Sequence, residues 1–174
     1  YDSRTKTISI PNHEVMEQFL STVKVMGWNS VVKALETSET LLQATIAGQE
    51  ETVADLIEKA HQANASILKY NDENSLSCVI SLAYYSAQKN YILHREMPAG
   101  KGFADIVFEP KRNCNLPALI VELKWGHSAE EAVEQIKQKN YIECLKNYRG
   151  EVLLVGVNYD KEKQHTCKIE RTKK

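Results

Sequence analysis

Three ionisable side chains lie inside apolar, strand-like runs in the middle of this 174-residue sequence. Asp105 stands within the run 103–108, and Glu122 and Lys124 stand within the run 118–125. Side chains two residues apart on a strand project from the same face, so Glu122 and Lys124 are expected to share one face. An unpaired buried charge is costly, so a strand keeps such groups only beside a partner, a metal ion or solvent in a cleft. Two carboxylates and an ammonium group brought together could hold a hard cation and an anionic substrate.

A helix expected to begin after Asn71 would bring a further carboxylate to the same place. Its apolar residues recur at spacings of three and four, which indicates a stripe facing the core, and they are Leu76, Val79, Ile80, Ala83, Tyr84 and Ala87. Glu73 stands three residues before Leu76, so it continues this buried stripe. The alternative is that Asp72 and Glu73 only complement the positive end of the helix dipole, which suits Asp72 better than Glu73.

The elements around these residues follow an α/β pattern. Strands are expected over 91–97, 103–109, 118–125, 151–159 and 165–171. A capping box of Ser128 and Glu131 opens a helix that we expect to run to about Asn147. Gln135 and Lys139, four residues apart, share one flank of that helix. The order of helix, three strands, helix and two strands predicts an α/β sandwich with a mixed central sheet flanked by helices.

The first seventy residues show helical periodicity and no catalytic constellation. A short strand is expected over 4–10, followed by helices that are interrupted near Gly27 and Gly48. We therefore divide the chain into a helical region, 1–70, and an α/β domain, 71–174.

Composition and charge exclude several classes of protein. The sequence is 43% hydrophobic and 26% charged, as in globular domains, and it has neither a run long enough to cross a membrane nor a signal-peptide pattern. The net charge of −1 gives no overall attraction to nucleic acid, although residues 71–174 hold sixteen basic side chains against fourteen acidic ones. The four cysteines form no Cys-x-x-Cys pair, which argues against a zinc site or disulfide framework and favours the cytoplasm. The five histidines are scattered, so each is expected to be an ordinary side chain.

Four segments of the sequence resemble the PD-(D/E)XK nuclease superfamily. They are Tyr70-Asn-Asp-Glu-Asn-Ser-Leu-Ser, Gly100-Lys-Gly-Phe-Ala-Asp-Ile-Val, Ile120-Val-Glu-Leu-Lys-Trp and Val155-Gly-Val-Asn-Tyr-Asp. They look like the branch that follows a predicted AAA-type ATPase domain in bacterial proteins. The resemblance covers 70–174 and implies a restriction-endonuclease-like fold, with an ATPase domain in the same polypeptide and the preceding helices as the linker. Ala104 departs from the proline of the motif, but the ligand is the Asp that follows.

The resemblance implies hydrolysis of phosphodiester bonds by an endo- or exonuclease that depends on Mg²⁺ or Mn²⁺, with DNA as the expected substrate. Asp105 and Glu122, joined by Glu73 and the carbonyl group of Leu123, would hold the metal ion, since hard cations prefer oxygen ligands. Lys124 would orient or deprotonate the attacking water, and two neighbouring carboxylates favour its charged form.

Other residues are expected around this centre. Gln135 matches a glutamine that relatives place beside the site, where it could bond the water or the phosphate. The candidates for contact with the nucleic-acid backbone are Lys101, Lys137, Lys139 and Tyr141. These four could equally be ordinary solvated residues.

Other interpretations stay open. Lys124 could form a structural salt bridge with Asp105 or Glu122, although buried ion pairs add little stability. The domain could also be a nuclease-like module that binds nucleic acid, or docks on an ATPase partner, without cutting. A third possibility is a helical linker and scaffold. The sequence leaves open DNA versus RNA, and whether two copies pair as a homodimer.

Overall fold

The computed structural model describes the chain at residue 14 and over 29–64, 73–112, 114–160 and 164–174. For residues 29–32, 63–64, 73–75 and 164 the structure describes the backbone and not the side chains. The chain divides into two compact units, 1–36 and 37–174, and the second holds the sheet. The strand expected over 4–10 and the helix expected before Gly27 fall outside the described residues.

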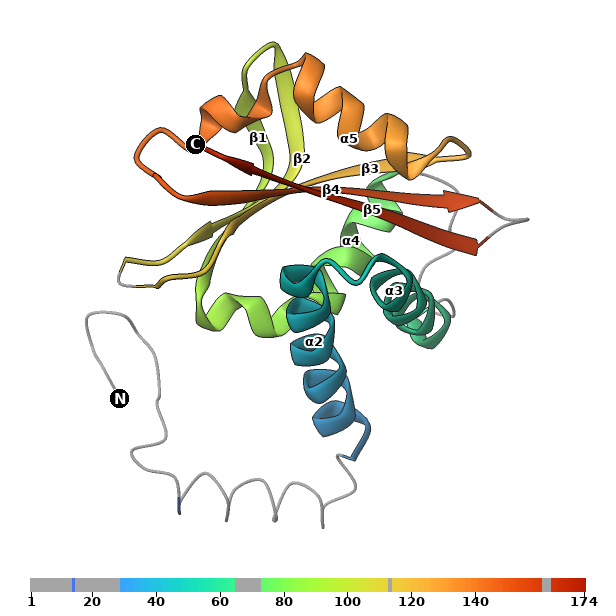
Figure 1. The fold of residues 1–174 in the computed structure, drawn as a ribbon. Coiled ribbons are helices and arrows are strands. Elements are labelled where there is room, and N and C mark those ends of the chain that lie inside the picture. The colour runs from blue at the N-terminus through green and yellow to red at the C-terminus, as the bar shows by residue number, and fades with distance from the viewer. Residues whose placement is uncertain (1–13, 15–28, 65–72, 113, 161–163) are drawn as a thin grey trace. The chain divides into compact units, whose positions relative to one another are not determined.

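A five-stranded sheet forms the centre of the second unit (Figure 1). Its strands lie side by side in sequence order: β1 Tyr91–Ala99, β2 Gly102–Pro110, β3 Ala118–Trp125, β4 Glu151–Asp160 and β5 Gln164–Lys173. Only β3 and β4 are parallel; the other neighbouring pairs are antiparallel. A parallel pair needs a crossover connection, and helix α5 (Ala129–Gln138) supplies it. The predicted restriction-endonuclease-like α/β class, with a mixed sheet flanked by helices, is confirmed.

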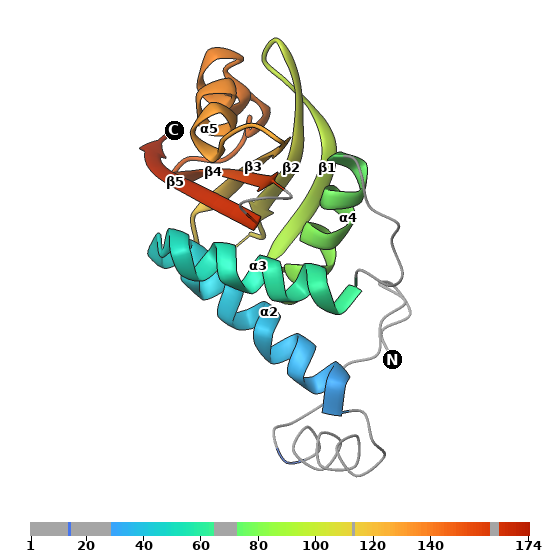
Figure 2. The same ribbon diagram turned by 90° about the vertical axis from the view of Figure 1, so that its right-hand side faces the viewer.

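Helices cover both faces of this sheet (Figures 1 and 2). Helix α5 packs on one face, and α3 (Glu50–Asn64), α4 (Glu73–Ala83) and the end of α2 (Asn29–Ala47) pack on the other. The predicted central strand β3 divides its side chains between two cores. Leu119, Val121 and Leu123 belong to the core on the α3 and α4 side, and Ala118 and Ile120 to the core on the α5 side.

The helices before the sheet follow the sequence pattern closely. Gly48, with φ of +77°, separates α2 from α3, as the interruption predicted there requires. Helix α4 ends at Ala83, earlier than its apolar stripe suggests, and a 3₁₀ helix, η1 (Tyr85–Lys89), carries the stripe on to Ala87. All six stripe residues are buried. In the part of the chain that is described, no helix is long and apolar enough to cross a membrane.

The helix expected from Ser128 to about Asn147 is shorter than predicted. Helix α5 ends at Gln138, and Asn140 takes a left-handed conformation with φ of 55° before a second 3₁₀ helix, η2 (Tyr141–Cys144). The carbonyl group of Lys139 accepts a hydrogen bond of 3.0 Å from the backbone N–H of Lys101 in the β1–β2 turn. A tertiary hydrogen bond at the C-terminal end of α5 therefore stands where the local pattern predicted further helix.

Candidate active site

The β1–β2 hairpin reverses its pleat in the middle, and this reversal positions Asp105. On β1, the odd-numbered side chains Tyr91 and Leu93 pack on the side of α3 and α4. After the reversal, the odd-numbered side chains Met97 and Ala99 pack on the side of α5. On β2, Ala104 packs on the α5 side and Ile106 packs on the α3 and α4 side, so the pleat of this strand reverses between them. Glu96, with φ of +48°, lies at the reversal, between the register pairs that flank Asp105. Positive φ is uncommon for a residue other than glycine.

Strand β2 leaves β3 at the same point. The two strands pair only from Phe108 to Ile106. Just beyond this ladder, the backbone N–H of Leu123 donates a 2.7 Å hydrogen bond to Oδ2 of Asp105. Where the backbone hydrogen bonds between β2 and β3 end, the Asp105 carboxylate takes the place of a backbone acceptor. This hydrogen bond fixes Asp105 against β3 next to Glu122.

Glu122 is the most buried of the described acids of the site. Its residue is 2% exposed, and on β3 it follows Ala118 and Ile120, the alternate residues that belong to the α5-side core. Its Oε1 accepts hydrogen bonds from Nζ of Lys124, at 3.4 Å, and from Nε2 of Gln135. Its Oε2 is buried and has no hydrogen-bond partner among the described residues. A buried carboxylate oxygen without a partner is costly, so this atom is suited to a ligand.

The electrostatics of Glu122 follow from this environment. Burial raises the pKa of its carboxyl group to about 7, the charge of Asp105 adds to the rise, and Lys124 and Lys139 oppose it. The hydrogen bond from the backbone N–H of Leu123 holds the Asp105 carboxylate beside the residue that follows Glu122. Without a cation, the Glu122 carboxyl group is therefore only partly ionised at neutral pH.

Helix α5 is held against the sheet beside Glu122 by a close backbone approach. In the β3–β4 register Glu122 pairs with Gly156. A Cβ atom on Gly156 would lie 2.1 Å from the carbonyl oxygen of Ala129, so only glycine allows the first turn of α5 to sit here. This packing sets the depth of the helix that carries Gln135.

The turn from β3 into α5 is fixed by side-chain hydrogen bonds. Asn158, buried on β4, accepts from the backbone N–H of His127 at 3.1 Å. The Oγ of Ser128 accepts from the N–H of Glu131 at 3.1 Å, which confirms the predicted N-cap. The Glu131 carboxylate contacts Nδ1 of His127 instead, at 3.2 Å.

A cleft opens over these residues along α5. Its lining consists of Lys124, His127, Glu131, Glu134, Gln135, Gln138 and Lys139. The side chain of Lys124 is 17% exposed and that of Glu122 3%, so the lysine lies between the buried acid and the cleft. The two glutamates of the lining were not predicted as site residues: the sequence pattern assigned Glu131 to the capping box and gave Glu134 no role.

The predicted contacts with a nucleic-acid backbone separate into different environments. Lys139 lines the cleft, and Lys101 is exposed in the adjoining β1–β2 turn. Lys137 is outside the cleft lining and pairs with Glu170 of β5 at 2.8 Å. Tyr141 is 1% exposed, and its hydroxyl oxygen accepts from Nε2 of Gln135 at 3.3 Å. We therefore remove Tyr141 from the candidate surface contacts: its ring lies in the α5-side core and its hydroxyl supports Gln135.

Glu73 is the first residue of α4. Its side chain is outside the described part of the structure, so its role as a ligand stays a prediction.

A second polar group lies elsewhere in this unit. It contains Glu58 and His61 of α3 and His165 of β5. The separation of these residues along the chain hid the group from sequence reasoning, which took each histidine as ordinary. The only local signal is the Glu-x-x-His spacing on α3, which places two ligand types on one helix face.

A model described as the PD-(D/E)XK nuclease superfamily matches residues 71–169, more than half of the chain. The matched region contains Asp105, Glu122, Lys124 and Gln135. Comparison with curated proteins gives no significant match.

Proposed function

This chain belongs to the PD-(D/E)XK nuclease superfamily, and on that premise we propose that it is a metal-dependent nuclease that hydrolyses phosphodiester bonds in DNA. One observation carries the proposal. Asp105, Glu122 and Lys124 gather where β2 leaves β3, beside an open cleft. Membership of a nuclease superfamily supports a hydrolytic activity on nucleic acid, while DNA, the ion and the residue roles are our inference.

The residues at this point suit Mg²⁺ or Mn²⁺. Hard cations prefer carboxylate and carbonyl oxygens, and Glu122 offers a buried Oε2 that has no hydrogen-bond partner among the described residues. Asp105 is held in place by the Leu123 N–H, and Glu73 and the Leu123 carbonyl group are the further proposed ligands. When bound, such an ion supplies Lewis-acid polarisation of the phosphate and a more acidic water.

Lys124 contributes positive charge at the border between the buried acids and the cleft. Its ammonium group lies 3.4 Å from Oε1 of Glu122, so it is tethered on one side and faces the cleft on the other. There it can orient the attacking water and stabilise the negative charge that develops on the phosphate. We assign it this electrostatic role in preference to that of a general base.

Gln135 acts as a positioning residue in this scheme. Its Nε2 donates to Oε1 of Glu122 and to the Tyr141 hydroxyl. These hydrogen bonds turn the Glu122 carboxylate so that Oε2 is presented away from Gln135. The sequence resemblance suggested contact with water or phosphate; the hydrogen bonds favour support of the acid.

The cleft also provides the proposed route for the substrate backbone. Lys139 in its lining and Lys101 in the neighbouring turn can neutralise phosphates without reading sequence. An AAA-type ATPase domain in the same polypeptide stays a prediction, which depends on the resemblance of the four sequence segments.

The proposal is tested by incubating the purified chain with single-stranded DNA, double-stranded DNA and RNA, in Mg²⁺, in Mn²⁺ and in chelator. We expect cleavage of DNA only with metal, and a loss of about 100-fold or more in Lys124→Ala, the size typical of a removed transition-state donor. Lys111→Ala is the matched control, because Lys111 is an exposed lysine whose Nζ bonds the carbonyl groups of Gln88 and Lys89.

No metal-dependent cleavage of any of these substrates would contradict the proposal. Nucleic-acid binding without cutting would then favour the catalytically silent module.

A further inference from the structure

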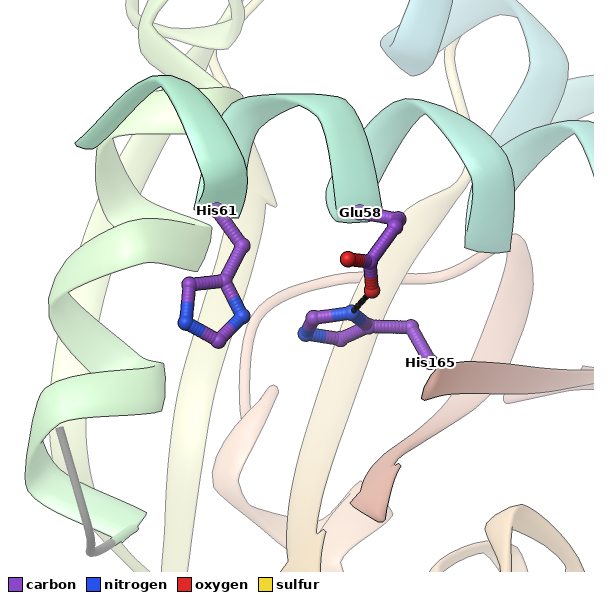
Figure 3. A group of neighbouring side chains, drawn as sticks. All are labelled: Glu58, His61 and His165. Carbon is purple, nitrogen blue, oxygen red and sulfur yellow. Dashed lines mark hydrogen bonds and ion pairs between the residues drawn. The ribbon is translucent and has the colours of Figure 1, made fainter. Parts of the chain in front are cut away.

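Glu58, His61 and His165 form a compact polar group on the face of the sheet opposite α5 (Figure 3). One potential ligand atom of each side chain lies within 4.8 Å of the other two. Glu58 and His61 are three residues apart on α3, so they project from the same side of that helix. His165, near the start of β5, points back toward both of them.

The buried imidazole of His165 leaves one nitrogen available. Its side chain is 0% exposed, and Nδ1 lies 2.5 Å from Oε2 of Glu58. Because a carboxylate can only accept, Nδ1 donates this hydrogen bond, and in the neutral ring Nε2 then keeps its lone pair. Nε2 is buried and has no hydrogen-bond partner among the described residues. A buried acceptor in this state points to a ligand that the polypeptide itself does not supply.

Aromatic rings complete the walls of the group. The ring of Tyr159 lies 4.8 Å from that of His61 and 4.7 Å from that of His165, measured between centroids. Trp125 packs on Tyr159 at 4.7 Å. These rings hold the imidazoles in place, and the partly exposed Glu58 side chain, 19% accessible, leaves a route of entry from solvent.

We propose that Glu58, His61 and His165 bind a Zn²⁺ ion that fastens α3 to β5. Two imidazole nitrogens and a carboxylate oxygen are donors that Zn²⁺ accepts, at about 2.0–2.2 Å each, with a fourth position left for water. In a tetrahedral site such donors are about 3.4 Å apart, whereas the potential ligand atoms here lie up to 4.8 Å apart. On binding the ion at Nε2 of His165, the Glu58 carboxylate would exchange its hydrogen bond with Nδ1 of that ring for the metal, and side-chain rotations of Glu58 and His61 would close the remaining distance. Mg²⁺ is the poorer candidate because it prefers oxygen ligands alone.

This site differs from the proposed nuclease centre in place and in chemistry. Glu122 shares its face of β3 with Ile120 of the α5-side core, and the proposed nuclease ligands offer oxygen donors, whereas the zinc ligands lie on the α3 side and include two nitrogens. Helix α3 precedes the part of the chain that matches the nuclease family. The ion would therefore join a preceding helix to the nuclease core and would have a structural role.

Equilibrium dialysis against ZnCl₂ tests the proposal without reference to cleavage. The protein carries Asp105→Asn and Glu122→Gln, which removes the carboxylates of the nuclease centre as competing ligands. We expect one Zn²⁺ per chain in this background, at least about tenfold weaker binding after Glu58→Gln or His61→Gln, and a melting temperature that zinc raises only while the group is intact. His94→Ala is the matched control: His94 contacts Glu109 at 3.1 Å in a second His–Glu pair outside the group.

The conservative Gln replacements guard against unfolding, and circular dichroism in chelator identifies variants that keep the fold. His165→Gln is measured as well, since its ring is the most deeply buried of the three. Zinc bound equally well after Glu58→Gln and His61→Gln, or no zinc bound by the intact group, would overturn the proposal. The group would then be an internal hydrogen-bonded cluster.

Discussion

At the scale of single residues, the site depends on one carboxyl group held in an unfavourable environment. Burial raises the pKa of Glu122 from 4.5 to about 7, so its ionised form is disfavoured in the folded, metal-free chain. A raised carboxyl pKa contributes stability that is fully present below pH 4.5 and lost as the pH rises through 7. At 1.36 kcal/mol for each pKa unit, the loss between these limits is about 3 kcal/mol.

Glu122→Gln should therefore stabilise the protein in chelator at pH 8. Its free energy of unfolding should exceed that of the original chain by up to about 3 kcal/mol there and by little at pH 4.5. Chemical denaturation at the two pH values measures both differences. Mg²⁺ should then stabilise the original chain and leave the variant unchanged; a variant that is equally destabilised at both pH values would contradict this account.

Gln135→Ala should weaken metal binding more than substrate binding. Loss of a group that orients a metal ligand typically costs 10- to 100-fold in metal affinity or activity, so the Mg²⁺ concentration for half-maximal cleavage should rise by about that factor. Saturating Mg²⁺ should restore much of the rate, a rescue that a residue in contact with the phosphate would not show. Gln43→Ala is the control, since Gln43 is exposed and its side chain donates a hydrogen bond to Glu39 one turn earlier on α2.

At the scale of elements, the critical contact is between α5 and β4. Gly156→Ala would place a Cβ atom 2.1 Å from the Ala129 carbonyl oxygen and 3.0 Å from the Ala132 Cβ. Overpacking of this kind costs about 1–3 kcal/mol, and the shift of α5 would carry Gln135 away from Glu122. We expect a lower melting temperature, and reduced cleavage at temperatures where the variant is still folded. Cleavage that stays at the original rate in the folded variant would contradict the role we give to α5.

The elements themselves could largely be predicted from the sequence. Strand β3 occupies the predicted range, 118–125, because its apolar run is buried on both faces, and the Ser128 cap forms as expected. The end of α5 could not be predicted, since it coincides with a hydrogen bond between Lys139 and the distant Lys101 turn.

The candidate site was predictable only in part. The same-face rule on β3 correctly grouped Glu122 with Lys124, but nothing local shows that Tyr141 is buried under Gln135. The Glu58–His165 contact joins residues 107 positions apart, beyond the reach of any periodicity.

At the scale of the whole molecule, the region that matches the nuclease family shares a hydrophobic core with the helices before it. The compact unit that contains the sheet spans residues 37–174, and the division of the chain at residue 70 stays a prediction. Leu41, Leu42, Val53 and Ile57, all in the preceding helices, are at most 1% exposed and share one core with β4.

Removal of residues 1–70 should therefore abolish independent folding. The truncated chain would expose the apolar face of the sheet that α2 and α3 cover, and large exposed apolar patches lead to aggregation. Removal of residues 1–36 is the comparison and should leave a folded monomer. Size-exclusion chromatography and thermal denaturation of the two truncated chains measure the outcome; a stable, monomeric 71–174 would show that the preceding helices are dispensable.

The left-handed conformation of Glu96 has a consequence for how this sequence can diverge. That residue is exposed and its backbone conformation, with φ of +48°, accompanies the reversal that brings Asp105 to β3. Its carboxylate has no part in the proposed reaction, so natural drift here should be limited by conformation alone, with Gly and Asn tolerated and β-branched residues rare. The residue at position 96 in related sequences would then indicate whether the backbone reversal that places Asp105 against β3 is maintained.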